Sequence, residues 1–310
     1  MERYDAIIIG AGPAGLAAGI YLARARQRVV ILDQGTVGGQ VLLTHAVANY
    51  PGLPELSGYE LVGTMRSQAE QFGCDIVSNT GITRIDLRPE IKTVETAKGA
   101  YQARTVILAM GGTPRSLGLP SEERLKGRGI SYCATCDGDF FTDQEIMVVG
   151  GGNSALEEAV SLTRYASKVT IVHQFDHFQG YEHAIREAKE NPKITFMMES
   201  VVQEFLGETD LTGARIRHIP TGETSEIAVT GAFIFIGYAP NTDLVRECVV
   251  LNERNEIIAD ESMATSVPGV FVAGDARQKR FRQITTAVGD GTVAALAAMD
   301  YLQQHVTVPV

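Results

Sequence analysis

Two glycine-rich turns of the same form constrain the fold of this chain more than any other feature. The first, GAGPAG over 10–15, follows the apolar run DAIII and precedes a helix-like stretch, after which the run RVVIL ends on Asp33. The second, GGGNSA over 150–155, follows EIMVV, and KVTIV comes after its helix. A turn of this kind between a buried strand and a helix is the fingerprint of a dinucleotide-binding βαβ unit. The repeat therefore predicts two nucleotide-binding units.

The predicted fold class is α/β, with two Rossmann-like three-layer nucleotide-binding domains, the second inserted into the first. Breaks at GGTP (111–114) and GYAP (237–240) mark the crossings between them. We therefore expect a discontinuous domain of residues 1–112 and 241–310, and an inserted domain of residues 113–240. Other expected elements are helices over about 58–72 and 283–304 and strands over 104–109, 195–198, 232–236 and 269–273.

Composition narrows the classes of function. The formal net charge of −10 argues against a nucleic-acid partner, because phosphate binding needs a basic surface. The sequence has no run of about 18 apolar residues, so no membrane span is expected. Four cysteines are too few for a disulfide-stapled secreted fold, and the N-terminus lacks the pattern of a secretory signal. We therefore expect a reducing, cytoplasmic compartment.

The first glycine motif predicts a site for a dinucleotide. Gly10 permits the tight turn, Gly12 lets the backbone approach a pyrophosphate, and Gly15 allows the helix to pack closely on the strand. The helix N-terminus offers N–H groups and a positive dipole end to the phosphates. Asp33 stands where a carboxylate accepts the ribose hydroxyls of an adenosine.

Further polar segments bear on the rest of that nucleotide. The segments Gly38-Gly39-Gln40 and Asn49 to Gly52 are candidates to meet a flat heterocycle. Asp275, after the apolar run GVFVA, is a candidate to hold a polyol hydroxyl. A basic cluster follows in ARQKRFRQ (276–283). It is interpreted either as a surface for an acidic partner, as a contact for a pyrophosphate, or as a solvated loop.

The stretch SYCATCDGDFF (131–141) contains a Cys-x-x-Cys pair. A zinc site would need four ligands, and His173 and His177 would have to supply two of them across an unusually long spacing. A structural staple over two residues would constrain little chain entropy. A working redox pair is the favoured interpretation. Asp137 follows the pair and is either an acid–base group for a thiolate or a helix cap.

The motifs GAGPAGLAAGIYLARA, GGQ, NYPG, CATCDG, GGGNSALEEA, GVFVAGD and RQITTAVGDG occur in the order found in the low-molecular-weight thioredoxin reductases. The chain resembles this family from about Tyr4 to Leu302. The resemblance implies FAD in the outer domain, NADPH in the inserted domain, a homodimer, and thioredoxin or a similar small redoxin as partner. It also implies that Cys136 faces the flavin and that Cys133 attacks the partner disulfide.

The candidate site residues follow from the motifs and the resemblance together. The catalytic set is Cys133, Cys136 and Asp137, and no metal site is expected. The first cofactor set is Gly10, Gly12, Pro13, Ala14, Gly15, Asp33, Gln34, Gly39, Gln40, Thr44, Asn49, Gly274, Asp275, Arg282, Gln283 and Ile284. The second cofactor set is Gly150, Gly152, Asn153, Ser154, Ala155, His173 and Gln174.

The sequence departs from the family after the second nucleotide unit. NADPH-using relatives show His-Arg-Arg and a further Arg at this place, whereas this chain reads HQFDHFQG over 173–180. Arginines here pair with the 2′-phosphate of NADP, so their loss puts NADPH in doubt. We rank NADH or weakly selective use first. A non-nicotinamide donor or acceptor comes next, either ferredoxin, a deazaflavin or a second FAD in the inserted domain.

Three other functions stay open on the sequence. One is the flavoprotein component of a peroxide reductase working with a separate redoxin. Another is a diflavin enzyme that moves electrons from thiols to a different acceptor. The last is a non-enzymatic flavin redox sensor whose cysteine pair switches conformation.

Overall fold

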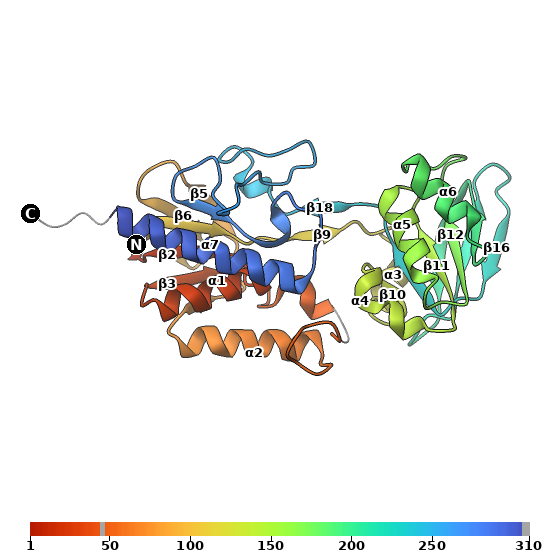
Figure 1. Cartoon of the computed structure of the whole chain (residues 1–310), viewed down its shortest axis with the longest axis horizontal. Helices are drawn as coiled ribbons and strands as arrows, with labels where there is room; N and C mark the ends of the chain where they lie inside the picture. Colours follow the sequence, from red (N-terminus) through yellow and green to blue (C-terminus); the bar gives the residue numbers. More distant parts are fainter. Residues whose placement is uncertain (44–46, 306–310) are drawn as a thin grey trace, which may run out of the picture. The chain divides into compact units, whose positions relative to one another are not determined.

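A computed structural model describes residues 1–43 and 47–305 (Figure 1). The chain forms two compact units, one of Met1–Thr113 with Ala239–Val310 and the other of Pro114–Tyr238. The two crossing segments pair as strands β9 (Gly112–Pro114) and β18 (Tyr238–Pro240). The fold class is confirmed as α/β, with a five-stranded parallel sheet in each unit.

The parallel sheet of the first unit has the strand order β19-β8-β2-β3-β4. Its central strands are short runs of apolar residues buried on both faces, as expected for a sheet covered on both sides. The strands are β2 (Ala6–Ile9), β3 (Val29–Leu32), β4 (Asp75–Val77), β8 (Thr105–Leu108) and β19 (Val270–Val272).

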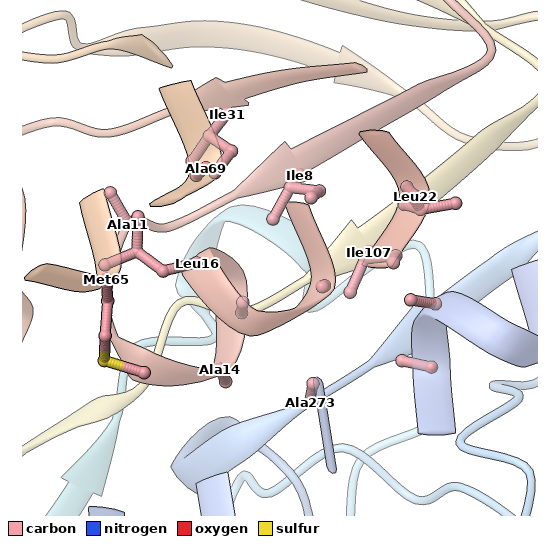
Figure 2. Packing of buried hydrophobic residues seen from close by; sticks show 14 of the residues in the cluster. Ile8, Ala11, Ala14, Leu16, Leu22, Ile31, Met65, Ala69, Ile107 and Ala273 are labelled. Atoms are coloured by element: carbon pink, nitrogen blue, oxygen red, sulfur yellow. The ribbon is translucent and has the colours of Figure 1, made fainter. Parts of the chain in front are cut away.

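Three helices cover one face of this sheet. They are α1 (Pro13–Arg24), α2 (Gly58–Gln71) and α7 (Ile284–Gln304), and α1 packs against both of the others. Figure 2 shows Ile8, Ile31 and Ile107 of the strands together with Leu16 of α1, all members of the buried cluster on this face. Alternation along each strand sends the neighbouring side chains to the other face.

An antiparallel layer covers that other face, where Ile7, Val30 and Val106 pack with Val94 and Tyr101. This second sheet has the order β1-β7-β6-β5, with β1 pairing parallel at its edge. Its strands are β1 (Glu2–Arg3), β5 (Ile82–Asp86), β6 (Lys92–Thr96) and β7 (Gly99–Ala103). Short 3₁₀ segments complete the unit at η1 (Gly39–Leu43), η3 (Asp243–Val245) and η4 (Gly274–Ala276).

The second unit repeats the plan with a parallel sheet of order β10-β17-β11-β12-β13. Its strands are β10 (Ile130–Ser131), β11 (Glu145–Val149), β12 (Lys168–Val172), β13 (Ile194–Met197) and β17 (Gly231–Ile234). The remaining elements are α3 (Pro120–Leu125), α4 (Ala134–Asp137), η2 (Gly138–Phe141), α5 (Asn153–Leu162), α6 (Glu182–Glu190), β14 (Ser200–Leu206), β15 (Gly213–His218) and β16 (Thr224–Ile227).

The two faces of this sheet again have separate cores. Ile146 and Val148 of β11 pack with α5 and α6, whereas Met147 and Val149 pack with Phe205 and its neighbours in the antiparallel sheet β14-β15-β16. Within the part of the chain that the structure describes, no helix has the length and apolar character needed to cross a membrane.

Candidate redox and nucleotide sites

The glycine turn of the first unit leaves no room for side chains at two of its positions. Gly10 has φ +107°, and a Cβ there would lie 2.2 Å from the carbonyl oxygen of Ala109. A Cβ on Gly15 would lie 1.9 Å from the carbonyl oxygen of Gly10. Gly12 has open space instead, and it precedes α1 without a side-chain cap. The turn therefore leaves the helix N-terminus open to a phosphate group.

Asp33 binds the glycine turn itself. Its Oδ2 accepts the N–H of Ala11 at 2.6 Å, and its Oδ1 accepts the N–H of Gly35 at 2.7 Å. Each carboxylate oxygen keeps a second lone pair that is able to accept a ribose hydroxyl. The sequence pointed to a ligand contact only, because the bond to Ala11 depends on how the turn folds. The next residue, Gln34, is exposed.

Other predicted residues converge on the same turn. The N–H of Gly38 donates to the carbonyl of Ala11 at 2.9 Å, and a Cβ on the exposed Gly39 would lie 3.5 Å from the Cα of Gly12. On the α7 side, a Cβ on Gly274 would lie 3.0 Å from the Cβ of Ala14. Segments from three parts of the chain thus surround the N-terminus of α1, and Pro13 is its first residue.

The remaining residues predicted for this site are less closely tied to the turn. Thr44 lies outside the described residues. Asn49 is exposed, and none of the contacts found in 1–43 and 47–305 joins it to the turn. Arg282 forms an ion pair with the buried Glu256, and Gln283 caps α7 just before Ile284. Gln40 is exposed in η1.

The basic cluster is in part a buried ion network. Arg277 Nε and Nη2 donate to the two oxygens of Asp290 at 3.0 and 3.1 Å, and Lys279 Nζ donates to Asp290 Oδ2 at 2.7 Å. Lys279 Nζ also lies 3.8 Å from Asp275 Oδ1. Burial alone would raise the pKa of Asp290, but the bonds from Arg277 and Lys279 outweigh burial and lower it. Neither cation is therefore part of a solvated loop that steers a partner.

The glycine turn of the second unit has the same construction. Gly150 has φ +138°, and a Cβ there would lie 2.4 Å from the carbonyl oxygen of Phe235 and 3.0 Å from the Cβ of Ala155. Gly152 precedes α5 without a side-chain cap. Asn153 Oδ1 accepts the N–H of Tyr181, and Ser154 is exposed. This turn therefore also presents a helix N-terminus, with the loop after β12 bound beside it.

His173 shapes that loop from inside. Its ring is buried, its Nε2 lies 3.0 Å from the carbonyl oxygen of His177, and it stacks on Phe178 at a centroid distance of 5.7 Å. A Cβ on Gly151 would lie 2.4 Å from the ring. Burial lowers the pKa of His173, which favours the neutral ring that packs against the turn.

The exposed part of the same loop carries no cation. Gln174, Phe175 and Asp176 are exposed, and Asp176 Oδ1 lies 2.6 Å from Nδ1 of His177. The segment 173–182, HQFDHFQGYE, contains neither Lys nor Arg. The residues that follow the second strand of such a unit face the adenosine ribose. The loop therefore offers hydrogen-bonding groups and an aromatic ring at this place.

The cysteine pair forms a disulfide at the start of α4. The Cα atoms of Cys133 and Cys136 are 5.3 Å apart, and both residues are half-buried. Cys133 is the N-cap residue, and its Sγ accepts the N–H of Cys136 at 3.2 Å. The two other cysteines are in different surroundings, and burial raises the pKa of the Cys74 thiol to about 12. Cys133 and Cys136 are thus the cysteines placed for exchange chemistry.

Asp137 ends α4, and its side chain makes no helix cap. Its Oδ2 accepts the hydroxyl of Ser131 at 2.5 Å. Burial raises the pKa of Asp137, and the bond from Ser131 opposes that effect without cancelling it. A carboxyl with a raised pKa beside a cysteine pair is suited to hold and release a proton. The sequence did not single out Ser131, although its position two residues before Cys133 was visible.

Known proteins are similar to this chain in sequence and in architecture. Residues 4–291 match the family model described as pyridine nucleotide-disulphide oxidoreductase. The chain is 44% identical to a thioredoxin reductase of Peptoclostridium acidaminophilum, with 97% of this chain and 98% of the relative covered. It is 40% identical to a 34.2 kDa protein of the rubredoxin operon of Clostridium pasteurianum, with 97% and 98% covered. The crystal structure of the thioredoxin reductase from Streptococcus pyogenes matches with a TM-score of 0.94 and 42% identity, covering 97% of this chain and 99% of that one.

This chain belongs to the pyridine nucleotide-disulphide oxidoreductase family. Within that family its relatives are the low-molecular-weight thioredoxin reductases, and the Cys133–Cys136 disulfide fits their redox-active centre. It is an FAD-dependent oxidoreductase of that type.

Proposed function

We propose that the enzyme passes electrons through FAD to the Cys133–Cys136 disulfide and on to thioredoxin or a similar small redoxin, as a homodimer. The observation that carries the proposal is a half-buried Cys-x-x-Cys disulfide followed directly by a carboxyl with a raised pKa. The names of the relatives support the acceptor.

FAD fits the first unit. A dinucleotide needs close backbone approach at its pyrophosphate, and a Cβ at Gly15 would close that turn, whereas Gly12 has open space. Asp33 retains lone pairs for a ribose, Gly39 lies against the turn, and Asp275 follows β19 on the α7 side. When bound, FAD supplies the two-electron chemistry that links a donor to a disulfide.

The chemistry at the cysteines balances as a two-electron exchange. Reduction of the Cys133–Cys136 disulfide consumes two electrons and two protons and gives two thiols. Asp137 supplies one proton to a thiolate of the pair and takes it back on reoxidation. The Cys133 thiol then loses its proton and attacks the redoxin disulfide, which forms a mixed disulfide and releases one redoxin thiolate. The Cys136 thiol loses its proton and attacks Cys133, which re-forms the pair and releases the second redoxin thiolate, and the two protons end on the redoxin thiols. The exchange involves four sulfur atoms, two from the enzyme and two from the redoxin, and it starts and ends with one disulfide and two thiols.

For the donor, we propose a nicotinamide dinucleotide bound at the second turn with preference for NADH or with weak selectivity. The uncapped N-terminus of α5 supports binding of a pyrophosphate. The absence of Lys and Arg from 173–182, together with the carboxylate of Asp176, favours a ribose with a free 2′-hydroxyl over one with a 2′-phosphate.

Anaerobic titration of the purified holoenzyme with NADH, and separately with NADPH, tests the donor by bleaching of the flavin absorbance. We expect NADH to bleach the flavin at least as readily as NADPH. Bleaching by neither, while dithionite still reduces the flavin, contradicts the nicotinamide assignment and directs the search to ferredoxin, a deazaflavin or a second flavin. Reduction of a thioredoxin disulfide by the dithionite-reduced enzyme tests the acceptor separately.

A further inference from the structure

Ser131 is placed between the backbone of the cysteine pair and the acid beside it. It is buried and is the last residue of β10, where it is aligned with Phe233 of the neighbouring strand β17. Its Oγ donates to Asp137 Oδ2 at 2.5 Å and accepts the N–H of Cys133 at 3.1 Å. The carbonyl oxygen of Cys133 lies 3.3 Å from the same Oγ. One hydroxyl therefore has a carboxylate, an amide and a carbonyl within reach.

The hydroxyl of Ser131 can form hydrogen bonds with these partners whether Asp137 is ionised or protonated. A serine hydroxyl has one donor and two acceptor sites. When Asp137 is ionised, the hydroxyl donates to the carboxylate and accepts from Cys133 N–H. When Asp137 is protonated, the carboxylic acid donates to Oγ, and the hydroxyl rotates to donate to the Cys133 carbonyl. The bond count at Ser131 does not fall in either state.

We propose that Ser131 is the positioning residue that lets the half-buried Asp137 change its protonation state without losing its hydrogen-bond partner. The inference rests on the proposed roles of Cys133, Cys136 and Asp137. A buried carboxyl without such a partner would lose its hydrogen bond in one of its two states. The hydroxyl comes from the end of β10, which pairs with β17, and it ties the carboxyl to the backbone of Cys133.

The other charges near Asp137 do not replace this hydroxyl. α4 packs against η2 and α5. Asp139 of η2 raises the pKa of Asp137, so it opposes ionisation. The charged residues of α5 are Glu157, which lies 4.0 Å from His183, and the half-buried Glu158, and α5 contains no Lys or Arg. Among the described residues 1–43 and 47–305, Ser131 is therefore the one whose side chain favours the ionised form of Asp137.

The test is the pH dependence of disulfide reduction by dithiothreitol in the FAD-loaded enzyme, followed by alkylation and mass spectrometry of Cys133 and Cys136. Rates are divided by the fraction of dithiothreitol present as thiolate at each pH. If Asp137 protonates the leaving thiolate, the corrected rate falls as pH rises through the pKa of Asp137. In Ser131→Ala that fall moves to higher pH by about one unit, because the ionised carboxyl has lost a hydrogen bond.

Matched variants separate positioning from a general structural effect. Ser131→Thr keeps the hydroxyl and is expected to restore the profile. Ser200→Ala removes a buried hydroxyl of the same unit that donates to the carbonyl of Met198, and is expected to leave the profile in place. In Asp137→Asn the corrected rate is expected no longer to fall as the pH rises. Adding Ser131→Ala to this variant should cause no further change.

Two results would overturn the inference. One is a Ser131→Ala enzyme that is slower at every pH with the fall unmoved, and the other is an equal shift in Ser200→Ala. The assay needs neither a nicotinamide donor nor a redoxin. An enzyme that fails to reduce thioredoxin therefore contradicts the proposed function without affecting this readout.

Discussion

The imidazole of His173 lies so close to Gly151 that a Cβ on the glycine would be 2.4 Å from the ring. The main-chain N–H of Gln179 donates to the carbonyl of Gly151 at 2.8 Å and fixes the other end of the same loop. The loop after β12 is thus held against the second glycine turn by packing and backbone bonds. Because side-chain charges do not form these contacts, we expect the loop to keep its conformation when charged residues are introduced into it.

Introducing arginines into this loop should therefore allow it to bind the 2′-phosphate of NADPH. We expect the double variant Gln174→Arg with Gln179→Arg to raise kcat/KM for NADPH relative to NADH by at least roughly ten- to a hundred-fold, which is the gain from one charge-assisted bond of about 1.5–3 kcal/mol to the 2′-phosphate. Steady-state kinetics with both nucleotides measure the ratio. Gln303→Arg, which makes the same Gln-to-Arg change once at an exposed position of α7, is the control for an added positive charge elsewhere on the surface. An unchanged ratio in the double variant would contradict the placement of the ribose.

Gly15→Ala is expected to abolish retention of FAD. The added methyl would lie 1.9 Å from the carbonyl oxygen of Gly10, so the turn and the helix must separate. The ratio of flavin to protein absorbance after purification measures the loss. Gly63→Ala is the matched control, because Gly63 is an exposed helical glycine in α2 with nothing within 4 Å of the added Cβ. That change should keep FAD and stabilise the protein by about 0.4–1 kcal/mol. Full FAD content in Gly15→Ala would show that the turn tolerates a side chain.

The parallel sheets and their glycine turns could be predicted because the signal is local. β2 and β11 are apolar along their whole buried length, and each leads directly into its glycine turn and helix. The antiparallel strands were missed because their pattern is mixed. β16, for example, is mostly exposed, so it shows no run of apolar residues.

The side-chain networks could not be predicted because they depend on pairing across the fold. Asp290 was visible only as a helical residue, and its bonds to Arg277 and Lys279 require the segment after η4 to fold back on α7. Asp33 was predicted as a ligand contact, and its bond to Ala11 emerges only from the folded turn. The residue types of the sites could therefore be predicted, whereas their hydrogen bonds could not.

The roles proposed for the two cysteines predict different trapped species. Cys136→Ser leaves Cys133 without its partner, so it should accumulate a stable mixed disulfide with thioredoxin, visible by non-reducing electrophoresis. Cys133→Ser should accumulate much less. Both variants should lose turnover and keep FAD, whereas Cys248→Ser, at a half-buried position outside the pair, should keep both. Trapping by Cys133→Ser in place of Cys136→Ser would exchange the two roles.

The ion network at Asp290 predicts how stability depends on pH. The side chains of Asp290 and Lys279 are 8% and 6% exposed, so removing the carboxylate takes the ion-pair partner nearest to Lys279 away from a buried cation. Asp290→Asn should lower the free energy of unfolding at neutral pH by about 3–5 kcal/mol. The pKa of Asp290 is lower in the folded than in the unfolded chain. Its stabilisation is therefore complete above the ordinary pKa of an aspartate, about 3.9, and is lost as pH falls through the folded value.

Urea unfolding at a series of pH values measures this linkage. The difference in stability between wild type and Asp290→Asn should be largest near neutral pH and should shrink as the pH falls below about 4. Asp243→Asn is the matched control in the same unit, because its ion pair with Arg246 is exposed, with the Asp243 side chain 91% accessible. An exposed pair contributes about 0–1 kcal/mol, so this change should have little effect at any pH. A constant difference between wild type and Asp290→Asn across the series would mean that the carboxylate charge is not what the network needs.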